Sequence, residues 1–249
     1  MLLSAGLLAE TRLLLDAMTV KPTSTRARQI NRLIAALKAC GCWTRLDVLY
    51  MLAAHDSQAA LLNWKSPGTF TLQANNSPTF TADRGYAGDG VSMNLTNAYN
   101  PSTFGGAYTL NDAMLGVYVH SALTLVSAID MQIGNARLQT NAAVTAYGCR
   151  VNDVSALANG GPVAVGHWVG RRSVSTGREI WKNGALVFGP DAVASTALAG
   201  TLTLLAGTAA ANPSNARLSF AYAGGAVDAG GMSTKHSALM QYMQAVGAA

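Results

Sequence analysis

The amino-acid sequence predicts a mainly β protein, with one antiparallel β-sandwich over residues 66–249 and a helical arm over residues 1–65 before it. Three observations predict this division. Helical hydrophobic spacing fills the first 65 residues, Ser66-Pro67-Gly68 interrupts it, and short alternating apolar runs separated by Gly-, Asn- and Pro-rich turns follow. We therefore expect the sandwich to be the main folded body and the arm to serve attachment or oligomerisation.

The arm opens with two segments of helical character. The first, Leu2 to Met18, is rich in Leu and Ala and ends before Pro22. The second, Thr25 to Ala39, is followed by Gly41 in the position expected of a helix C-terminus. Its apolar residues have the i, i+3, i+4, i+7 spacing of an amphipathic helix: Ile30, Leu33, Ile34 and Leu37.

A third run, Trp43 to Trp64, has heptad spacing and is also predicted to be helical. The residues that recur at alternating intervals of three and four are Trp43, Leu46, Tyr50, Ala53, Ser57, Ala60 and Trp64. Two interpretations stay open. The stripe packs within its own chain, or it forms a symmetric self-association seam.

Downstream of residue 66 the apolar residues alternate, as they do in half-buried strands. Leu115, Val117 and Val119 form one such run, and Leu202 and Leu204 another. The clearest local prediction is a tight hairpin at Asn183-Gly184, because both residues tolerate the positive φ of a type I′ turn. The chain is expected to close with a helix from Thr234 to Val246, capped by Ser233.

Composition favours a protein that functions in a large assembly. Only 12% of the residues are charged, against about 25% in an ordinary soluble domain. Residues 1–65 carry eight Lys and Arg against four acids, so nearly all of the net charge of +5 belongs to the arm. Arg26, Arg28 and Arg32 are read as a solvated helix face, and specific nucleic-acid binding is not expected. No segment approaches 18 uninterrupted apolar residues, so no membrane insertion is expected.

Three cysteines, Cys40, Cys42 and Cys149, give no sign of a disulfide framework or a zinc site. Cys40 and Cys42 are too close together for a zinc knuckle, and no second pair exists. A reducing compartment during synthesis is therefore expected, with no metal and no cofactor.

The sequence offers no convincing catalytic pair of carboxylates. Glycoside hydrolysis needs two carboxyl groups about 5–10 Å apart, and the chain has two glutamates, Glu10 in the arm and Glu179 in a strand where it is expected to face solvent. The aspartates that remain to be tested in such a pair are Asp83, Asp89, Asp112, Asp130 and Asp153. No dense Asp cluster predicts calcium binding, so Asp83, Asp89 and Asp112 are interpreted as turn formers.

The four histidines are interpreted as structural. His55 lies in the third helical run without a second ligand at metal spacing, and His167 lies in an alternating strand beside Trp168. His120 follows a strand, and His236 opens the closing helix, each without an acidic neighbour in sequence.

Four stretches in order resemble the concanavalin A-like, laminin-G-like jelly roll. The segment from Pro78 to Gly90 resembles its opening strand and Gly-rich turn, and Val165 to Val169 resembles its central strand. Trp181-Lys182-Asn183-Gly184 resembles its aromatic hairpin, and Phe220 to Gly231 its last strands before a packed helix. The resemblance covers about residues 70–249.

A narrower resemblance concerns function. Leu46 to Lys65, running on into Pro78 to Tyr86, is similar to tailed-bacteriophage and prophage proteins in which a helical leader precedes a laminin-G-like domain. The resemblance implies a non-enzymatic virion structural protein, associated with tail or capsid and made in the host bacterial cytoplasm. We expect its partners to be other virion proteins, further copies of itself (a trimer as the first guess) and a host surface glycan. The alternatives are a polysaccharide-depolymerising enzyme and a capsid cement protein without a ligand.

Overall fold

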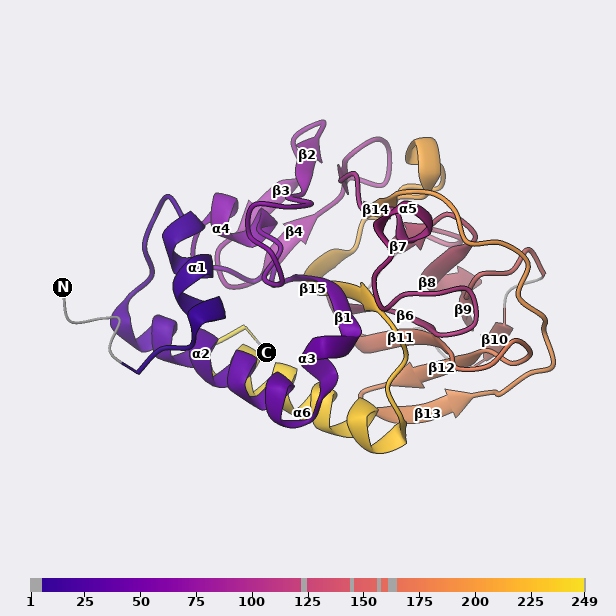
Figure 1. Ribbon diagram of the computed structural model, residues 1–249. Helices are drawn as coiled ribbons and strands as arrows, with labels where there is room; N and C mark the ends of the chain where they lie inside the picture. The colour runs from indigo at the N-terminus through magenta and orange to yellow at the C-terminus, as the bar shows by residue number, and fades with distance from the viewer. Residues whose placement is uncertain (1–5, 122–124, 144–145, 156–157, 161–164, 249) are drawn as a thin grey trace.

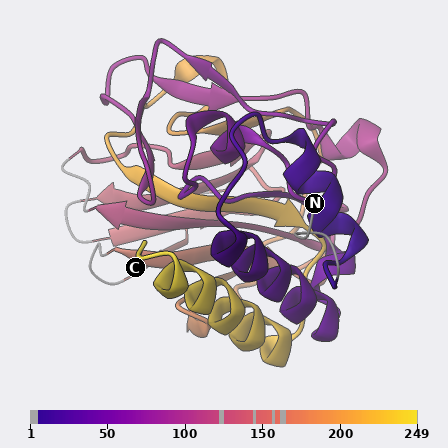
Figure 2. The same ribbon diagram turned by 90° about the vertical axis from the view of Figure 1, so that its left-hand side faces the viewer.

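The computed structural model describes residues 6–248 apart from 122–124, 144–145, 156–157 and 161–164. Two antiparallel sheets lie face to face, and helices cover the outer side of one of them (Figures 1 and 2). The predicted β-sandwich is thus confirmed as the fold class.

The first sheet has eight strands and carries the helices on its outer side. Six of its strands follow the order β13 (Ala185–Phe188), β12 (Glu179–Lys182), β11 (Gly166–Arg172), β6 (Ala113–Ser121), β15 (Arg217–Gly224) and β4 (Gly85–Ala87). Strand β3 (Thr79–Thr81) extends this order, and β1 (Leu46–Tyr50) pairs with the remaining length of β15.

The second sheet has seven strands. Their order is β10 (Ala158–Gly160), β9 (Ala146–Arg150), β8 (Ala136–Ala143), β7 (Met131–Ile133), β14 (Leu202–Leu204), β5 (Asn94–Thr96) and β2 (Gln73–Asn75). The inner faces of the two sheets meet around Gly170, where a Cβ would lie 3.2 Å from Leu115 of the first sheet and 3.4 Å from Leu138 of the second. The core therefore forms from the alternate apolar residues of both sheets.

The helices are short except for two. Helices α2 (Ser24–Ala39) and α6 (Ala229–Ala245) lie side by side, as Figure 2 shows at the lower front. The others are α1 (Ala9–Ala17), α3 (Cys42–Arg45), α4 (Ser57–Leu61), α5 (Pro101–Phe104) and a 3₁₀ turn, η1 (Thr208–Ala210).

Several local predictions are confirmed. Helix α2 buries its predicted stripe of Ile30, Leu33, Ile34 and Leu37. Asn183 and Gly184 have φ of 50° and 81° and join β12 to β13, as a type I′ hairpin requires. Helix α6 begins five residues before the predicted start, because the cap is Asp228, which accepts from the N–H of Gly231, and not Ser233.

The predicted helix from Trp43 to Trp64 is wrong. Leu46–Tyr50 is strand β1, paired antiparallel with β15, and helical residues occur only on either side of it, in α3 and α4. All five residues of β1 are buried. A short, mostly apolar run that is buried on both faces fits a strand as well as a helix, which is why hydrophobic spacing alone misassigned it.

The self-association seam proposed on that helix is also wrong. Most of its residues lie inside the chain's own core, including Trp43, Leu46, Tyr50 and Trp64. The segment 1–65 therefore contributes a strand to the eight-stranded sheet, and the sandwich does not start at Ser66 but includes residues N-terminal to it.

The expectation of no disulfide is corrected at one place. Gly41 adopts φ of 68° after the end of α2 and reverses the chain. The Cα atoms of Cys40 and Cys42 come to 5.3 Å apart, a separation that a disulfide spans, and the two sulfurs are bonded. Cys149 is free and buried.

Replacing Gly224 with alanine tests the pairing of β1 with β15. A Cβ at this position would lie 2.0 Å from the carbonyl oxygen of Arg45 and 2.8 Å from the Cα of Leu46. Both contacts are with backbone, so we expect Gly224→Ala to lower the free energy of unfolding by about 1–3 kcal/mol. Urea unfolding measures this change.

Gly68→Ala is the matched control, because no atom lies within 4 Å of a Cβ there. Its expected effect is within about 0.5 kcal/mol. If both variants were equally stable, the contact between β1 and Gly224 would be refuted and a separate helical arm would again be tenable.

Candidate functional site

The carboxylates that the sequence singled out are spread over the molecule, and each has structural partners. Asp83 pairs with Arg26, and Asp112 pairs with Arg45. Glu179 is half-buried, contrary to the expectation that it faces solvent, and it accepts from Arg171 and from Nε1 of Trp181.

The remaining aspartates are equally engaged. Asp89 accepts from the backbone N–H groups of Met93, Ser92 and Val91, which lower its pKa to about 2. This confirms its prediction as a turn former. Asp130 is buried against Thr140 and Ser214, and burial raises its pKa.

Asp153 is the centre of a buried ionic network at one end of the sandwich. Its carboxylate accepts from Nη1 of Arg178 at 3.0 Å and from Nη2 of Arg172 at 3.3 Å. Arg172 is fully buried and also donates to the carbonyl oxygens of Val151, Ser175 and Val193. These groups satisfy one another, so we assign the network to stability.

Two of the four histidines come together, which sequence reasoning missed because they are 69 residues apart. Nδ1 of His167 lies 3.1 Å from Nδ1 of His236, and Nε2 of His167 lies 2.8 Å from the hydroxyl of Tyr222. The other two are separate: His55 bonds to the carbonyl of Val20, and burial lowers the pKa of His120.

Lys235 of α6 lies beside this pair and is fully buried. Its ammonium nitrogen contacts Sδ of Met114 at 2.8 Å and lies 4.3 Å from the centre of the Tyr222 ring. Burial lowers the pKa of Lys235 and that of His167 well below their ordinary values. The cluster is enclosed, so it affects stability and its pH dependence and does not offer a binding surface.

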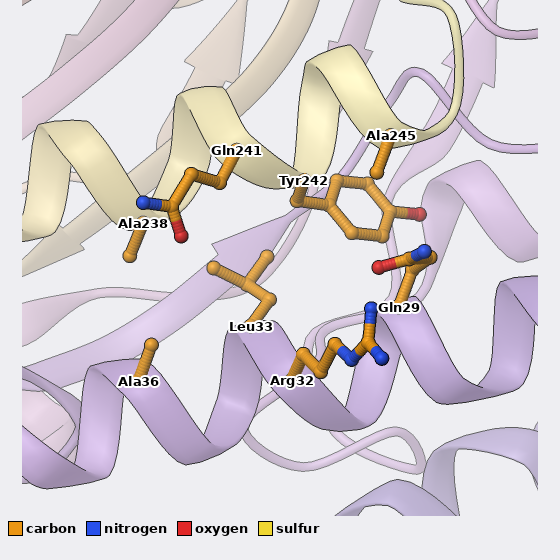
Figure 3. A pocket seen from close by; sticks show the side chains of 8 residues that line it. All are labelled: Gln29, Arg32, Leu33, Ala36, Ala238, Gln241, Tyr242 and Ala245. Atoms are coloured by element: carbon orange, nitrogen blue, oxygen red, sulfur yellow. The ribbon is translucent and has the colours of Figure 1, made fainter.

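A groove of about 240 Å³ follows the contact between α2 and α6 (Figure 3). Leu33 and Ala36 of α2 face Ala238 of α6 there, and the Tyr242 hydroxyl points toward Gln29. The groove is the gap left at the surface where the two helices pack together, and its lining does not favour any particular class of ligand.

The groove best suited to a ligand lies at the edge of the seven-stranded sheet, and we call it the Phe70 groove. It is open, has a volume of about 460 Å³ and lies within the size range of small-molecule sites. Its lining residues carry hydroxyl, amide or apolar side chains and no charge: Phe70, Thr71, Gln73, Thr96, Asn97, Ala98 and Thr201.

Phe70 has a strained backbone that its surroundings hold in place. Its φ is 57°, a conformation that costs a non-glycine residue about 1–3 kcal/mol. The carbonyl oxygen of Phe70 accepts from the Tyr50 hydroxyl at 2.7 Å and from Nδ2 of Asn97 at 3.0 Å. Strain that is fixed by buried partners is typical of binding and catalytic positions.

Aromatic rings continue from the groove along the surface. Phe70 packs edge-to-face against Tyr99 and Phe104, with ring centres 5.5 Å and 5.2 Å apart. Phe104 is 45% exposed. The Tyr99 hydroxyl donates to Asp47 of β1, so the ring cluster is anchored to the core. The result is a rigid apolar platform beside amides and hydroxyls, an arrangement that suits a sugar ring with one apolar face and polar edges.

The sequence alone assigns no role to the residues of the groove. The groove depends on Tyr50 and Asp47, which the sequence placed in a separate helix. Among the described residues, no group of three or more His, Cys, Asp or Glu side chains is placed to hold a metal ion. No helix in the described part of the chain is long and apolar enough to span a bilayer.

Comparisons with known proteins support the fold class. No family model matches the chain, and no curated protein matches it. The structure is similar to that of Trypanosoma rangeli sialidase in complex with 2,3-difluorosialic acid, with a TM-score of 0.54 and 12% identity over 85% of this chain and 37% of that one. It is also similar to the botulinum neurotoxin serotype D binding domain, with a TM-score of 0.56 and 6% identity over 78% of this chain and 52% of that one.

The chain spans less than two thirds of either neighbour. At this identity the likeness defines the class alone: a mainly β protein with two antiparallel sheets packed as a sandwich. One of the two neighbours is an enzyme and the other is a binding domain.

Proposed function

We propose that this protein is a non-enzymatic structural component of a bacteriophage particle, tail- or capsid-associated, that binds a surface glycan through the Phe70 groove. The observation that supports glycan binding is the groove itself, a supported aromatic ring beside uncharged amides and hydroxyls. The phage assignment rests on the resemblance of residues 46–65 and 78–86 to phage proteins.

The enzymatic alternative is less well supported. A depolymerase needs two carboxyl groups free to act on one substrate. The six candidate carboxyl groups are each held by structural partners, for example Asp83 by Arg26 and Asp153 by Arg172. None of them lines the Phe70 groove.

The proposal includes other virion proteins and further copies of this chain, a trimer as the first guess, as partners in the particle.

Location in the particle has a direct test. Mass spectrometry of purified phage particles should detect the chain, and antibodies raised against it should label tail or capsid in electron micrographs. Absence from purified particles would exclude the virion assignment while leaving glycan binding to its own test.

Replacing Phe70 with leucine tests the groove. The substitution keeps an apolar side chain but removes the ring, so we expect glycan affinity to fall by about 5- to 30-fold, the effect of losing a contact worth about 1–2 kcal/mol. Isothermal titration of the full chain with bacterial surface oligosaccharides measures the change. The full chain is required because Tyr50 and Asp47 hold the groove.

Leu186→Ala is the matched control, because Leu186 is exposed on β13 of the other sheet. It should leave affinity unchanged. If the wild-type chain bound no oligosaccharide, the ligand-free capsid cement alternative would be favoured. If Phe70→Leu bound as tightly as the wild type, the ligand would lie elsewhere.

A further inference from the structure

A row of polar side chains crosses the outer face of the seven-stranded sheet, starting in the Phe70 groove. The cross-strand register places directly paired residues on one face of a sheet. The pairs run from β2 to β9 in this order: Gln73, Thr96, Thr203, Gln132, Arg137 and Arg150. Thr203 is buried, whereas the others are half-buried or exposed. The neighbours along each strand, such as Leu95 and Leu138, face the core instead.

The row ends in two arginines that lie directly opposite each other. Arg137 of β8 pairs with Arg150 of β9, and both side chains are half-buried. Like charges directly opposite on a sheet destabilise it. Burial, followed by the charge of Arg150, lowers the pKa of Arg137.

Neither arginine has a counter-ion among the described residues. The ion pairs there engage Glu10, Asp83, Asp112, Asp153, Glu179 and Asp191, all with other bases. No acidic side chain occurs in the segments that the structure does not describe, since these consist of Met, Leu, Ser, Ala, Thr, Val, Gly and Pro. The two guanidinium groups therefore face each other without a neutralising carboxylate side chain.

Polar atoms without hydrogen-bond partners concentrate on this part of the sheet. Nε of Arg137 and Nε of Arg150 are both buried and have no partner. The same holds for Oε1 of Gln139 and Oδ1 of Asn141, which follow Arg137 at alternate positions of β8, and both of these side chains are more than nine-tenths buried. The two amide oxygens lack a donor, whereas the two Nε–H groups are donors that lack an acceptor. The unpaired Nε–H groups of Arg137 and Arg150 therefore indicate a missing acceptor at the arginine pair.

We propose that Arg137 and Arg150 bind the carboxylate groups of an acidic glycan that lies across the strands from the Phe70 groove. Guanidinium groups recognise carboxylates through paired, charge-assisted hydrogen bonds. Neighbouring strands are about 4.8 Å apart, so Thr96 in the groove and Arg137 are separated by three strand spacings, about 14 Å. An oligosaccharide of a few sugars spans that distance. The glycan part of this inference rests on the proposed function, whereas the anion site stands on the arginine pair itself.

A matched pair of ligands tests the assignment on the full chain. The ligands are tetragalacturonate and the same oligomer with its carboxyl groups reduced to alcohols. We expect the wild type to prefer the acidic oligomer by at least tenfold, the effect of one or two charge-assisted hydrogen bonds. Arg137→Gln/Arg150→Gln should abolish that preference and leave binding of the neutral oligomer unchanged.

Two controls separate this effect from charge and stability. Arg28→Gln/Arg32→Gln removes the same charge from α2 and should keep the preference. The unfolding free energy of Arg137→Gln/Arg150→Gln should equal or exceed that of the wild type, because the substitution relieves like-charge repulsion. A purely structural arginine pair would instead lose stability on substitution.

The outcomes distinguish the two proposals. Phe70→Leu should weaken both oligomers equally. A preference for the acidic oligomer that survives in Arg137→Gln/Arg150→Gln would overturn the arginine site, as would equal binding of both oligomers by the wild type. If neither oligomer bound, the glycan function would be contradicted, and the arginine site would then be judged by a second measurement.

That measurement follows the side-chain N–H resonances of the two arginines by NMR while monomeric galacturonate or inorganic phosphate is added. Galacturonate should shift the Nε resonances of Arg137 and Arg150 and leave those of Arg28 and Arg32 in place. No shift with galacturonate would refute the site. Shifts with phosphate alone would refute its assignment to carboxylates.

Discussion

Replacing Asp153 with alanine is expected to lower the free energy of unfolding by about 3–5 kcal/mol, a loss typical of breaking a buried ion pair by removing one partner. The carboxylate contacts both Arg172 and Arg178 and also accepts from the backbone N–H groups of Val151 and Ser155. Its removal leaves the fully buried guanidinium of Arg172 without an anion. Urea unfolding followed by circular dichroism measures the loss.

Glu10→Ala provides the comparison, because Glu10 and Lys38 form an ion pair whose two side chains are partly exposed. Exposed pairs contribute about 0–1 kcal/mol, so this variant should be close to the wild type. Asp153→Asn should fall between the two, since an amide oxygen still accepts hydrogen bonds but carries no charge. If Asp153→Ala and Glu10→Ala had equal effects, a major stabilising role of the buried network would be refuted.

Replacing Lys235 with methionine is expected to stabilise the protein by about 1–3 kcal/mol near neutral pH. The wild-type side chain buries an amine against two methionine sulfurs and the Tyr222 ring, and Arg171 adds a like charge nearby. Methionine has a similar length and no group to desolvate. Such a gain on removing a lysine is uncommon and therefore diagnostic.

The same variant should change the pH dependence of stability. The unfolded chain holds the Lys235 proton up to about pH 10.5, while the folded protein loses it at much lower pH. Wild-type stability should therefore rise as the pH increases toward 10.5 and fall as the pH decreases from there. Lys235→Met should lack this rise between neutral pH and pH 10.5.

His167 makes the free energy of unfolding depend on pH in the acid range as well. Its folded pKa lies well below 6.5 because of burial and the neighbouring Lys235 and His236. The free energy of unfolding is therefore unaffected by His167 above pH 6.5, where the side chain is neutral in both states. It decreases as the pH falls below 6.5, because only the unfolded chain then binds the proton readily. Lys38→Met is the control for Lys235→Met, because Lys38 is exposed, and it should reproduce the wild-type profile between neutral pH and pH 10.5. An unchanged slope in Lys235→Met would show that the amine is not buried in solution.

Local chemistry made some elements predictable. The Asn183-Gly184 turn follows from the positive φ that both residues tolerate, whatever lies around them. The stripe of α2 follows from helical spacing, because one face packs on α6 and the sandwich while the other meets solvent. In such segments the environment differs between two faces, and the sequence records that difference.

Strand β1 shows why the rest was not predictable. Leu46–Tyr50 is buried on both faces, so its apolar residues carry no periodicity that separates strand from helix. Only pairing with β15, more than 170 residues away, decides its conformation. The Phe70 groove shares this dependence, because Tyr50 of β1 supports Phe70 and Asn97 joins them from another strand's end.

The sequence by itself determined the class of protein, since alternating strands, turn residues and an amphipathic helix are encoded in short stretches of chain. It also determined that charge is scarce and that no carboxylate pair stands out. The tertiary structure alone decided which residues meet: His167 with His236, Asp153 with Arg172, and Arg137 with Arg150. The reason is physical, because side chains far apart in sequence acquire their burial, their partners and their pKa values only when strand register brings them together.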